Sequence, residues 1–357
     1  MRNFIFCLIL VLGCQLARGE SFIATKAKAE QGDADAQLLL GNTYKIGKIV
    51  PQDLEEAFKW LMKAAEQGNA RAQLYVGYAY KMSQGVAKND KEAFKWSMKA
   101  AEQGDVNAQA CVASAYFSGE GVSRDYKEAF KWFIKAAEKG DYKIQTLILN
   151  SIYKEDVSKD YKEAIKWLME SADLGNAFAQ LFVGYAYQKG KVVPKDDEEA
   201  LKWLMRAAEQ RNAVAQFYVG SVYFSGNVVP KDFEDKALKW FVKSAEQGFA
   251  EAQWIVGFAY KNGLGVTEDF EEAFKWFMKA AEQGNAGAQF EIGFAYYKGH
   301  GVAKNYINAY AWFAVAGALD EKYSKMVKPT LDLISEEDRP KAKKMSREIF
   351  ERTIICR

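Results

Sequence analysis

The 357-residue sequence contains little histidine, cysteine or proline. His300 is the single histidine, and zinc sites and acid–base catalysis near neutral pH use this side chain more than any other. The four cysteines, Cys7, Cys14, Cys111 and Cys356, include no Cys-x-x-Cys pair and have no regular spacing, so they outline neither a zinc ribbon nor a disulfide framework. We therefore expect no metal, no cofactor and no histidine-based catalytic triad.

An excess of charge of one sign is also absent, since 49 lysines and arginines face 47 aspartates and glutamates. A nearly neutral chain of mixed sign is a poor ligand for nucleic acid, so we expect no nucleic-acid partner. With only 5 prolines and no linker rich in glycine or serine, the length does not indicate two domains on a tether. Apolar residues at 49% and aromatic residues at 14% exclude disorder and provide a buried core.

Residues 1–19 have the pattern of an export signal. Arg2 precedes an apolar run over residues 4–12, which is too short to span a bilayer and typical of a secretory signal peptide. Two processing routes stay open: cleavage after Gly19, or lipid attachment at Cys14, because residues 11–14 resemble a bacterial lipobox. We expect an exported protein that is periplasmic, attached to the outer membrane or secreted, or that lies in the endoplasmic-reticulum lumen of a eukaryote. A lipid on Cys14 is the only membrane attachment expected.

The rest of the chain is organised by a period of about 36 residues, a length typical of helical repeat arrays. Tryptophan marks the period at Trp60, Trp96, Trp132, Trp167, Trp203, Trp240, Trp276 and Trp312. A glutamine, here called the marker glutamine, recurs with it at Gln37, Gln73, Gln109, Gln145, Gln180, Gln216, Gln253 and Gln289. The sequence therefore contains eight copies of one unit.

Each unit predicts two helices. In the first, Ala72, Val76 and Tyr80 lie four residues apart and form one apolar stripe, with Gly77 on the same face to let a second helix approach closely. The second, as in residues 269–284, begins after an N-cap aspartate and ends at a glycine suited to a left-handed C-cap. The glycine-rich loop between the helices recurs without a preceding strand, so it indicates a turn and not a phosphate-binding loop.

Two copies depart from the pattern. Repeat four is one residue shorter, lacks the Gly-x-Gly loop and carries Ile144, Leu149 and Ile152 where other copies have alanine, glycine and tyrosine. Repeat five has Arg211 at the position of the capping glycine. We expect local adjustments at both places.

The order Ala-x-Ala-Gln-x-x-Val-Gly-x-x-Tyr, Gly-x-Gly-Val and Ala-x-x-Trp-x-x-x-Ala-Ala-Glu-x-Gly resembles the Sel-one-like repeat (SLR) family, relatives of the tetratricopeptide repeat. The resemblance implies an all-α, right-handed α-solenoid and a non-enzymatic adaptor that binds a protein or peptide. Residues 20–32 are expected to form a partial repeat or N-terminal cap, residues 33–320 the eight repeats, and residues 321–357 C-terminal capping helices. Two alternatives stay open: a hydrolase of β-lactam-like ligands, as in the family's cysteine-rich branch, and an endoplasmic-reticulum quality-control adaptor.

A partner-binding surface is predicted on the first helix of each repeat, opposite its core stripe. Rotation by about 100° per residue places the positions one, two and five after the marker glutamine on that face. Aromatic side chains concentrate there, densest in repeats five to eight, which we expect to be the main contact region. The predicted contacts are Tyr75, Tyr78, Phe182, Tyr185, Phe217, Tyr218, Trp254, Phe258, Phe290 and Phe294. The alternative is that these side chains pack between neighbouring first helices.

Overall fold

The computed structural model describes residues 22–139, 142–152, 159–190, 193–225 and 233–355. The predicted signal segment 1–19, with Cys14, lies outside the described residues. Every regular element within them is helical, and eight helix pairs follow one another along the chain. This order confirms the predicted all-α solenoid of eight helix hairpins.

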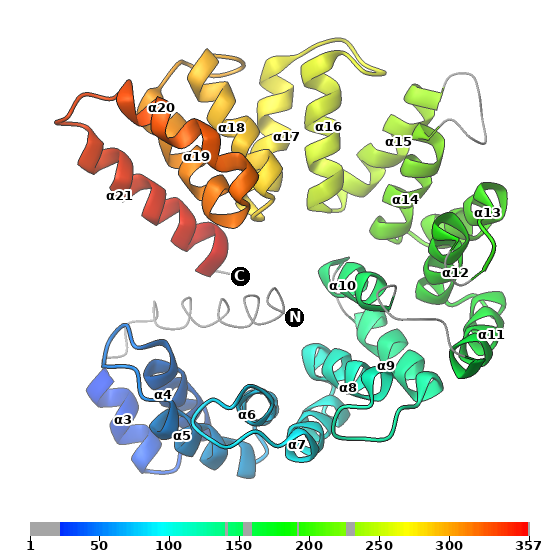
Figure 1. The fold of residues 1–357 in the computed structure, drawn as a ribbon, viewed down its shortest axis with the longest axis vertical. Coiled ribbons are helices and arrows are strands. Elements are labelled where there is room, and N and C mark those ends of the chain that lie inside the picture. The colour runs from blue at the N-terminus through cyan, green and yellow to red at the C-terminus, as the bar shows by residue number, and fades with distance from the viewer. Residues whose placement is uncertain (1–21, 140–141, 153–158, 191–192, 226–232, 356–357) are drawn as a thin grey trace. The chain divides into compact units, whose positions relative to one another are not determined.

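The helices of the eight hairpins alternate along the chain (Figure 1). The first helices are α4 (Ala34–Ile46), α6 (Ala70–Met82), α8 (Val106–Ser118), α10 (Tyr142–Ile152), α12 (Ala177–Lys189), α14 (Ala213–Phe224), α16 (Ala250–Asn262) and α18 (Ala286–Lys298). The second helices are α5 (Leu54–Glu66), α7 (Asp90–Glu102), α9 (Tyr126–Lys139), α11 (Lys159–Asp173), α13 (Asp197–Glu209), α15 (Phe233–Glu246), α17 (Phe270–Glu282) and α19 (Tyr306–Leu319).

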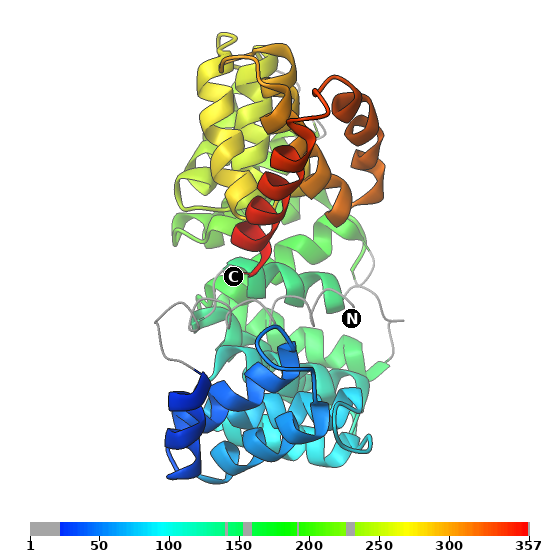
Figure 2. The same cartoon turned by 90° about the vertical axis from the view of Figure 1, so that its left-hand side faces the viewer.

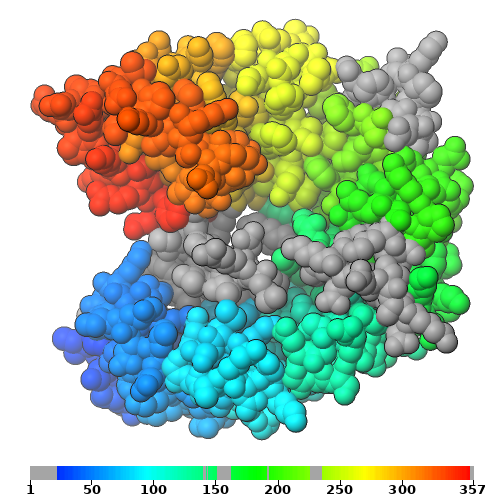
Figure 3. Space-filling view, in the orientation of Figure 1, coloured from blue at the N-terminus to red at the C-terminus, as the bar shows by residue number. Residues whose placement is uncertain are grey.

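The flanking elements are α3 (Phe22–Glu30) before the first hairpin and, after the last, the 3₁₀ turn η1 (Glu321–Met326), α20 (Val327–Asp332), α21 (Arg339–Phe350) and the π turn η2 (Glu351–Ile355). Helix α21 packs on α19 (Figures 2 and 3). Its side chains Ala342 and Ile349 are buried. These side chains cover apolar surface that the last repeat would otherwise expose to water.

The helix ends are built as the sequence predicts. Asp269 Oδ1 accepts hydrogen bonds from the backbone N–H groups of Glu271 and Glu272, both at 2.9 Å, and so caps α17. Gly284 follows the helix with φ of +83°. Arg211 takes the same left-handed backbone at φ of +63°, although it has a side chain. The chain turn is therefore retained there at the cost of backbone strain.

Six of the eight first helices carry a glycine that lets the second helix approach: Gly41, Gly77, Gly184, Gly220, Gly257 and Gly293. A Cβ atom on Gly257 would lie 2.7 Å from the Phe277 ring, and one on Gly77 would lie 2.7 Å from Ser97 Oγ. Both distances are shorter than a Cβ atom tolerates, so these two hairpins pack closely because the position holds glycine.

The marker glutamine ties successive repeats together. Gln73 Nε2 donates to the Ala65 carbonyl oxygen at 3.1 Å, which lies in the second helix of the preceding repeat. Its Oε1 accepts from Gln103 Nε2 at 2.7 Å, at the end of the second helix of its own repeat. One buried side chain thus joins three helices, and its polar atoms are both satisfied.

The chain divides into two compact units. The N-terminal unit extends to Val183, and the C-terminal unit begins at Gly184 within α12. The core of the N-terminal unit includes a cluster of Ala29, Leu40 and Trp60. The core of the C-terminal unit includes Phe277 and Ile292.

Candidate partner-binding surface

Burial separates two of the three predicted contact residues of the N-terminal unit from solvent. Tyr75 is 2% exposed and Phe182 is 0% exposed. The Phe182 ring lies 5.4 Å from the Phe130 ring in an edge-to-face contact. Tyr75 and Phe182 therefore pack between helices, which was the alternative considered from the sequence.

Tyr78 is half-buried and contacts Cys111, the only cysteine among the residues that the structure describes. The Tyr78 hydroxyl and Cys111 Sγ are 3.0 Å apart. Burial raises the pKa of the Cys111 thiol to about 11, so the thiol is protonated near neutral pH. A protonated thiol is a poor nucleophile, and Cys111 is a packing residue in this environment.

Tyr185 and Tyr218 form a tyrosine pair at the start of the C-terminal unit. Their ring centroids are 4.9 Å apart, and Tyr185 is buried whereas Tyr218 is partly exposed. Burial raises the pKa of both hydroxyls, so both stay neutral. Phe217 is half-buried against Phe241 and Phe249, with centroid distances of 5.6 and 5.1 Å. This part of the predicted surface is largely covered.

Helix α16 presents the most accessible of the predicted aromatic residues. Phe258 is 39% exposed, and its ring centroid lies 6.2 Å from that of Trp254. Trp254 is half-buried against α18, where a Cβ on Gly287 would lie 3.1 Å from its Nε1. Among the described residues, no atom accepts a hydrogen bond from this indole N–H. The partly buried Trp254 ring therefore packs against the exposed Phe258 ring and holds it in place.

Helix α18 continues the aromatic surface with Phe290 and Phe294, both half-buried. Their centroids are 4.9 Å apart, and each lies 5.3 Å from the Phe313 ring. Phe290 also contacts Tyr323 of η1 at 4.9 Å. The rings are thus held in place by neighbours while part of each remains accessible.

Trp254, Phe258, Phe290 and Phe294 together form what we call the α16–α18 patch. Beside it, Lys261 Nζ lies 2.7 Å from Glu291 Oε2, so this lysine and glutamate neutralise each other. Rigid aromatic rings next to a satisfied polar pair are typical of the energetically important centre of a protein–protein interface. The exposed part of the predicted surface is therefore concentrated in repeats seven and eight.

Groups for other chemistry are few. His300 is exposed, and its ring stacks 4.5 Å from that of Phe270. In the described ranges, no cluster of three or more histidine, cysteine, aspartate or glutamate side chains is arranged to hold a metal ion. None of the helices in the described part of the chain is both long and apolar enough to cross a bilayer.

The position eight residues after the marker glutamine makes contacts between repeats that were not predicted from the sequence. Lys261 occupies it in repeat seven, and Lys81 and Lys45 occupy it in repeats two and one. These lysines reach side chains of the following repeat, about 30 to 39 residues further along the chain, as with Lys261 and Glu291. The recurrence of lysine at this position in three repeats is the feature of the sequence that could have indicated these contacts.

The family model for the Sel1 repeat matches the chain eight times, at residues 34–69, 70–105, 106–141, 151–176, 177–212, 213–249, 250–285 and 286–320. No curated protein is similar enough to count as a match.

Two solved structures of Sel1-like repeat proteins are similar to this chain. The crystal structure of c5321, a protective antigen present in uropathogenic Escherichia coli strains that displays an SLR fold, is 33% identical in sequence, with a TM-score of 0.54. That match covers 93% of this chain and 72% of the other. A Sel1 repeat protein from Oxalobacter formigenes is 32% identical over 90% of this chain and 94% of its own, with a TM-score of 0.49.

Proposed function

Since the chain belongs to the Sel1 repeat family, we propose that it is an exported scaffold that binds another protein through the α16–α18 patch. Sel1 repeat proteins are generally scaffolds for protein–protein interactions. The observation that carries the proposal is the exposure of Phe258 on a supported aromatic surface. A large aromatic side chain held in place but open to solvent gains free energy when a partner covers it.

Export is supported by the sequence of residues 1–19, with its basic start and short apolar run. The E. coli relative is described as a protective antigen, which agrees with a location where other molecules can meet it. We place the protein in the bacterial envelope or the medium, released by cleavage after Gly19 or held by a lipid on Cys14.

Catalysis forms no part of this proposal, because the Sel1 repeat family is typically a non-catalytic scaffold. The hydrolase alternative required the paired cysteines of the cysteine-rich branch, and this sequence has no such pair in its repeats. The alternative of an endoplasmic-reticulum adaptor shares the fold, and no observation on the described residues favours it.

Affinity capture tests the proposed function. The tagged full chain is incubated with extracts of its own envelope, with its medium and with candidate target cells, and the bound proteins are identified by mass spectrometry. Phe258→Ala should reduce capture of the specific partner about tenfold or more, as the loss of an interface hot spot does. Leu319→Ala is the matched control, because Leu319 is 37% exposed in the second helix of repeat eight, off the patch.

A partner retained equally by both variants would overturn the patch as the contact surface. Capture of no specific protein by the wild type would overturn the scaffold function. Melting followed by circular dichroism shows that each variant is folded.

A further inference from the structure

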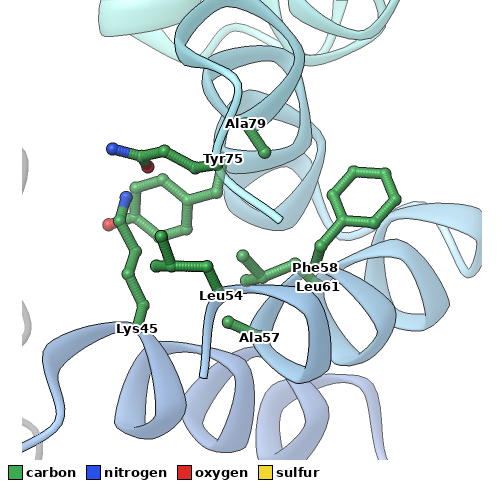
Figure 4. Close-up of a pocket in the computed structure, with 8 residues that line it drawn as sticks. Lys45, Leu54, Ala57, Phe58, Leu61, Tyr75 and Ala79 are labelled. Atoms are coloured by element: carbon green, nitrogen blue, oxygen red, sulfur yellow. The ribbon is translucent and has the colours of Figure 1, made fainter. Parts of the chain in front are cut away.

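The space beside Lys45, between repeats one and two, is closed to a partner. Leu54, Ala57 and Tyr75 are among the residues that line it (Figure 4). Ala57 and Tyr75 are each 2% exposed, so no side chain of a second protein can pack against them. Accessible lysines lie instead around the last repeat and η1 in the C-terminal unit.

A continuous row of aromatic rings extends the α16–α18 patch. We call it the aromatic row: Tyr323 of η1, Phe290, Phe294 and Tyr297 of α18, and Tyr306 of α19. Phe290 contacts Tyr323 and Phe294, both at a centroid distance of 4.9 Å. Tyr297 lies 6.4 Å from Phe294 and 5.6 Å from Tyr306. All five rings are half-buried, so part of each is accessible to solvent.

Lysine side chains lie over three rings of the aromatic row. The Nζ atoms of Lys298, Lys304 and Lys325 lie 5.6, 5.1 and 5.9 Å from the ring centroids of Tyr297, Tyr306 and Phe290, respectively. All three lysines are exposed. A lysine stem on an aromatic ring keeps its ammonium group beside the ring and in water. A partner that binds these ammonium groups therefore loses less side-chain entropy than it would with freely moving lysines.

None of these three lysines forms an ion pair with another described residue. Residues 286–328 contain three carboxylates, of which two are already paired. Glu291 pairs with Lys261 and Asp320 pairs with Lys322, each at 2.7 Å. Glu321 is left alone against the three ammonium groups. The rim of the aromatic row therefore carries an excess of positive charge.

Other repeats show what the position of Lys304 usually binds. Two of them carry a lysine there that is paired with an aspartate two residues later: Lys88 with Asp90 at 3.2 Å, and Lys195 with Asp197 at 3.3 Å. In repeat eight, Tyr306 stands in place of the aspartate. A hydrogen bond with the Tyr306 side chain raises the pKa of Lys304, so this lysine stays charged. Lys304 thus keeps the positive charge of this position without its carboxylate.

We propose that the segment of the partner protein that covers the α16–α18 patch is acidic. An apolar side chain of this segment packs on Phe258, and neighbouring carboxylates of the same segment bind Lys298, Lys304 and Lys325. A polypeptide is favoured over an anionic polysaccharide because lysines already lie over the ring faces on which a sugar would stack. The proposal rests on the proposed function, since it names the chemistry of the partner bound at the same patch.

Selection from a random peptide library displayed on phage tests this chemistry. The full chain is the bait, and the enriched peptides are sequenced and synthesised. We expect peptides with aspartates or glutamates beside an aromatic or aliphatic residue, and their binding should weaken as the salt concentration is raised. Enriched peptides of neutral or positive net charge would overturn the proposal, as would a selection that enriches no peptide.

Two triple variants make the test specific to the rim of the aromatic row. Replacing Lys298, Lys304 and Lys325 by glutamine should weaken binding of the enriched acidic peptide about tenfold or more. Replacing the same three lysines by glutamate should redirect the selection toward basic peptides. Acidic peptides enriched again by the glutamate variant would contradict the assigned contacts.

A matched control changes the net charge equally at other exposed lysines. Lys59, Lys95 and Lys202 lie on second helices, and each is paired with a glutamate three residues earlier. Their joint replacement by glutamine should leave peptide binding within about twofold of the wild type, because exposed charges elsewhere are screened by salt. An equal loss in both glutamine variants would show a response to net charge alone and would overturn the proposal.

Two further outcomes separate this proposal from its alternatives. Tighter binding of alginate, an anionic polysaccharide, than of the enriched peptide would overturn it in favour of a polysaccharide ligand. Peptides that are lost in Phe258→Ala but bind the glutamine variant of the rim normally would overturn the acidic partner and leave the proposed function standing. Peptides that bind Phe258→Ala as well as the wild type would contradict the α16–α18 patch itself.

Discussion

Each marker glutamine donates its side-chain amide to the carbonyl of the alanine eight residues earlier. Gln37, Gln73, Gln216 and Gln253 also accept from a second glutamine about thirty residues later. Repeat three breaks this pattern, because Lys139 stands where Gln103 stands in repeat two. Gln109 Oε1 is consequently buried without a hydrogen-bond partner among the described residues. An orphaned buried acceptor of this kind costs about 1–3 kcal/mol.

The change Lys139→Gln should therefore stabilise the protein by about 1 kcal/mol, because it returns a donor to Gln109. The measurement is the free energy of unfolding in urea. The reciprocal change Gln103→Lys should destabilise it, since it removes the 2.7 Å hydrogen bond to Gln73. No gain in Lys139→Gln would show that Gln109 is not limiting stability.

Arg211→Gly should stabilise the protein by about 1 kcal/mol, because a residue with a side chain is strained at a φ of +63°. The matched control is Gly68→Arg, at the same turn of repeat one, where φ is +90° and no atom lies within 4 Å of an added Cβ. It should lose a similar amount, through backbone strain alone. Unchanged melting temperatures in both variants would contradict this account of the turn.

At the scale of the element, the helix hairpin was predictable because its signals are local and repeated eight times. The tryptophans and marker glutamines recur at a fixed spacing, and the cap at Asp269 and the glycine at Gly257 act on neighbours within one repeat. The exposure of the predicted contact residues was not predictable. Tyr75 and Phe258 belong to the same face of a first helix, yet they are 2% and 39% exposed. The side chains of the neighbouring repeat decide that difference.

Gly257→Ala tests the packing of the hairpin. Alanine would ordinarily favour a helix over glycine, but here its Cβ would meet the Phe277 ring at 2.7 Å. We expect a loss of about 1–3 kcal/mol in the free energy of unfolding, as found for overpacked cores. Glu282→Ala on the exposed side of α17 is the control and should change stability little. A stabilised Gly257→Ala protein would mean that helix propensity outweighs the contact.

At the scale of the whole molecule, the two units differ at the predicted contact positions. The C-terminal unit carries the aromatic α16–α18 patch, beside which Lys261 and Glu291 form an ion pair. The N-terminal unit buries Tyr75 and Phe182, two of its predicted contact residues. A repeat scaffold can vary its contact residues in this way without changing its fold, because stability comes from positions shared by all repeats.

Photo-crosslinking from position 258 tests the central claim most directly. Phe258 is replaced by the photoreactive aromatic residue benzoylphenylalanine in the full chain, which is irradiated in its own envelope and medium fractions. The account predicts a light-dependent adduct with one partner protein from position 258, and no such adduct when the same residue replaces Leu319. The absence of an adduct from position 258, or an equal adduct from both positions, would contradict the claim that the α16–α18 patch is the partner-binding surface.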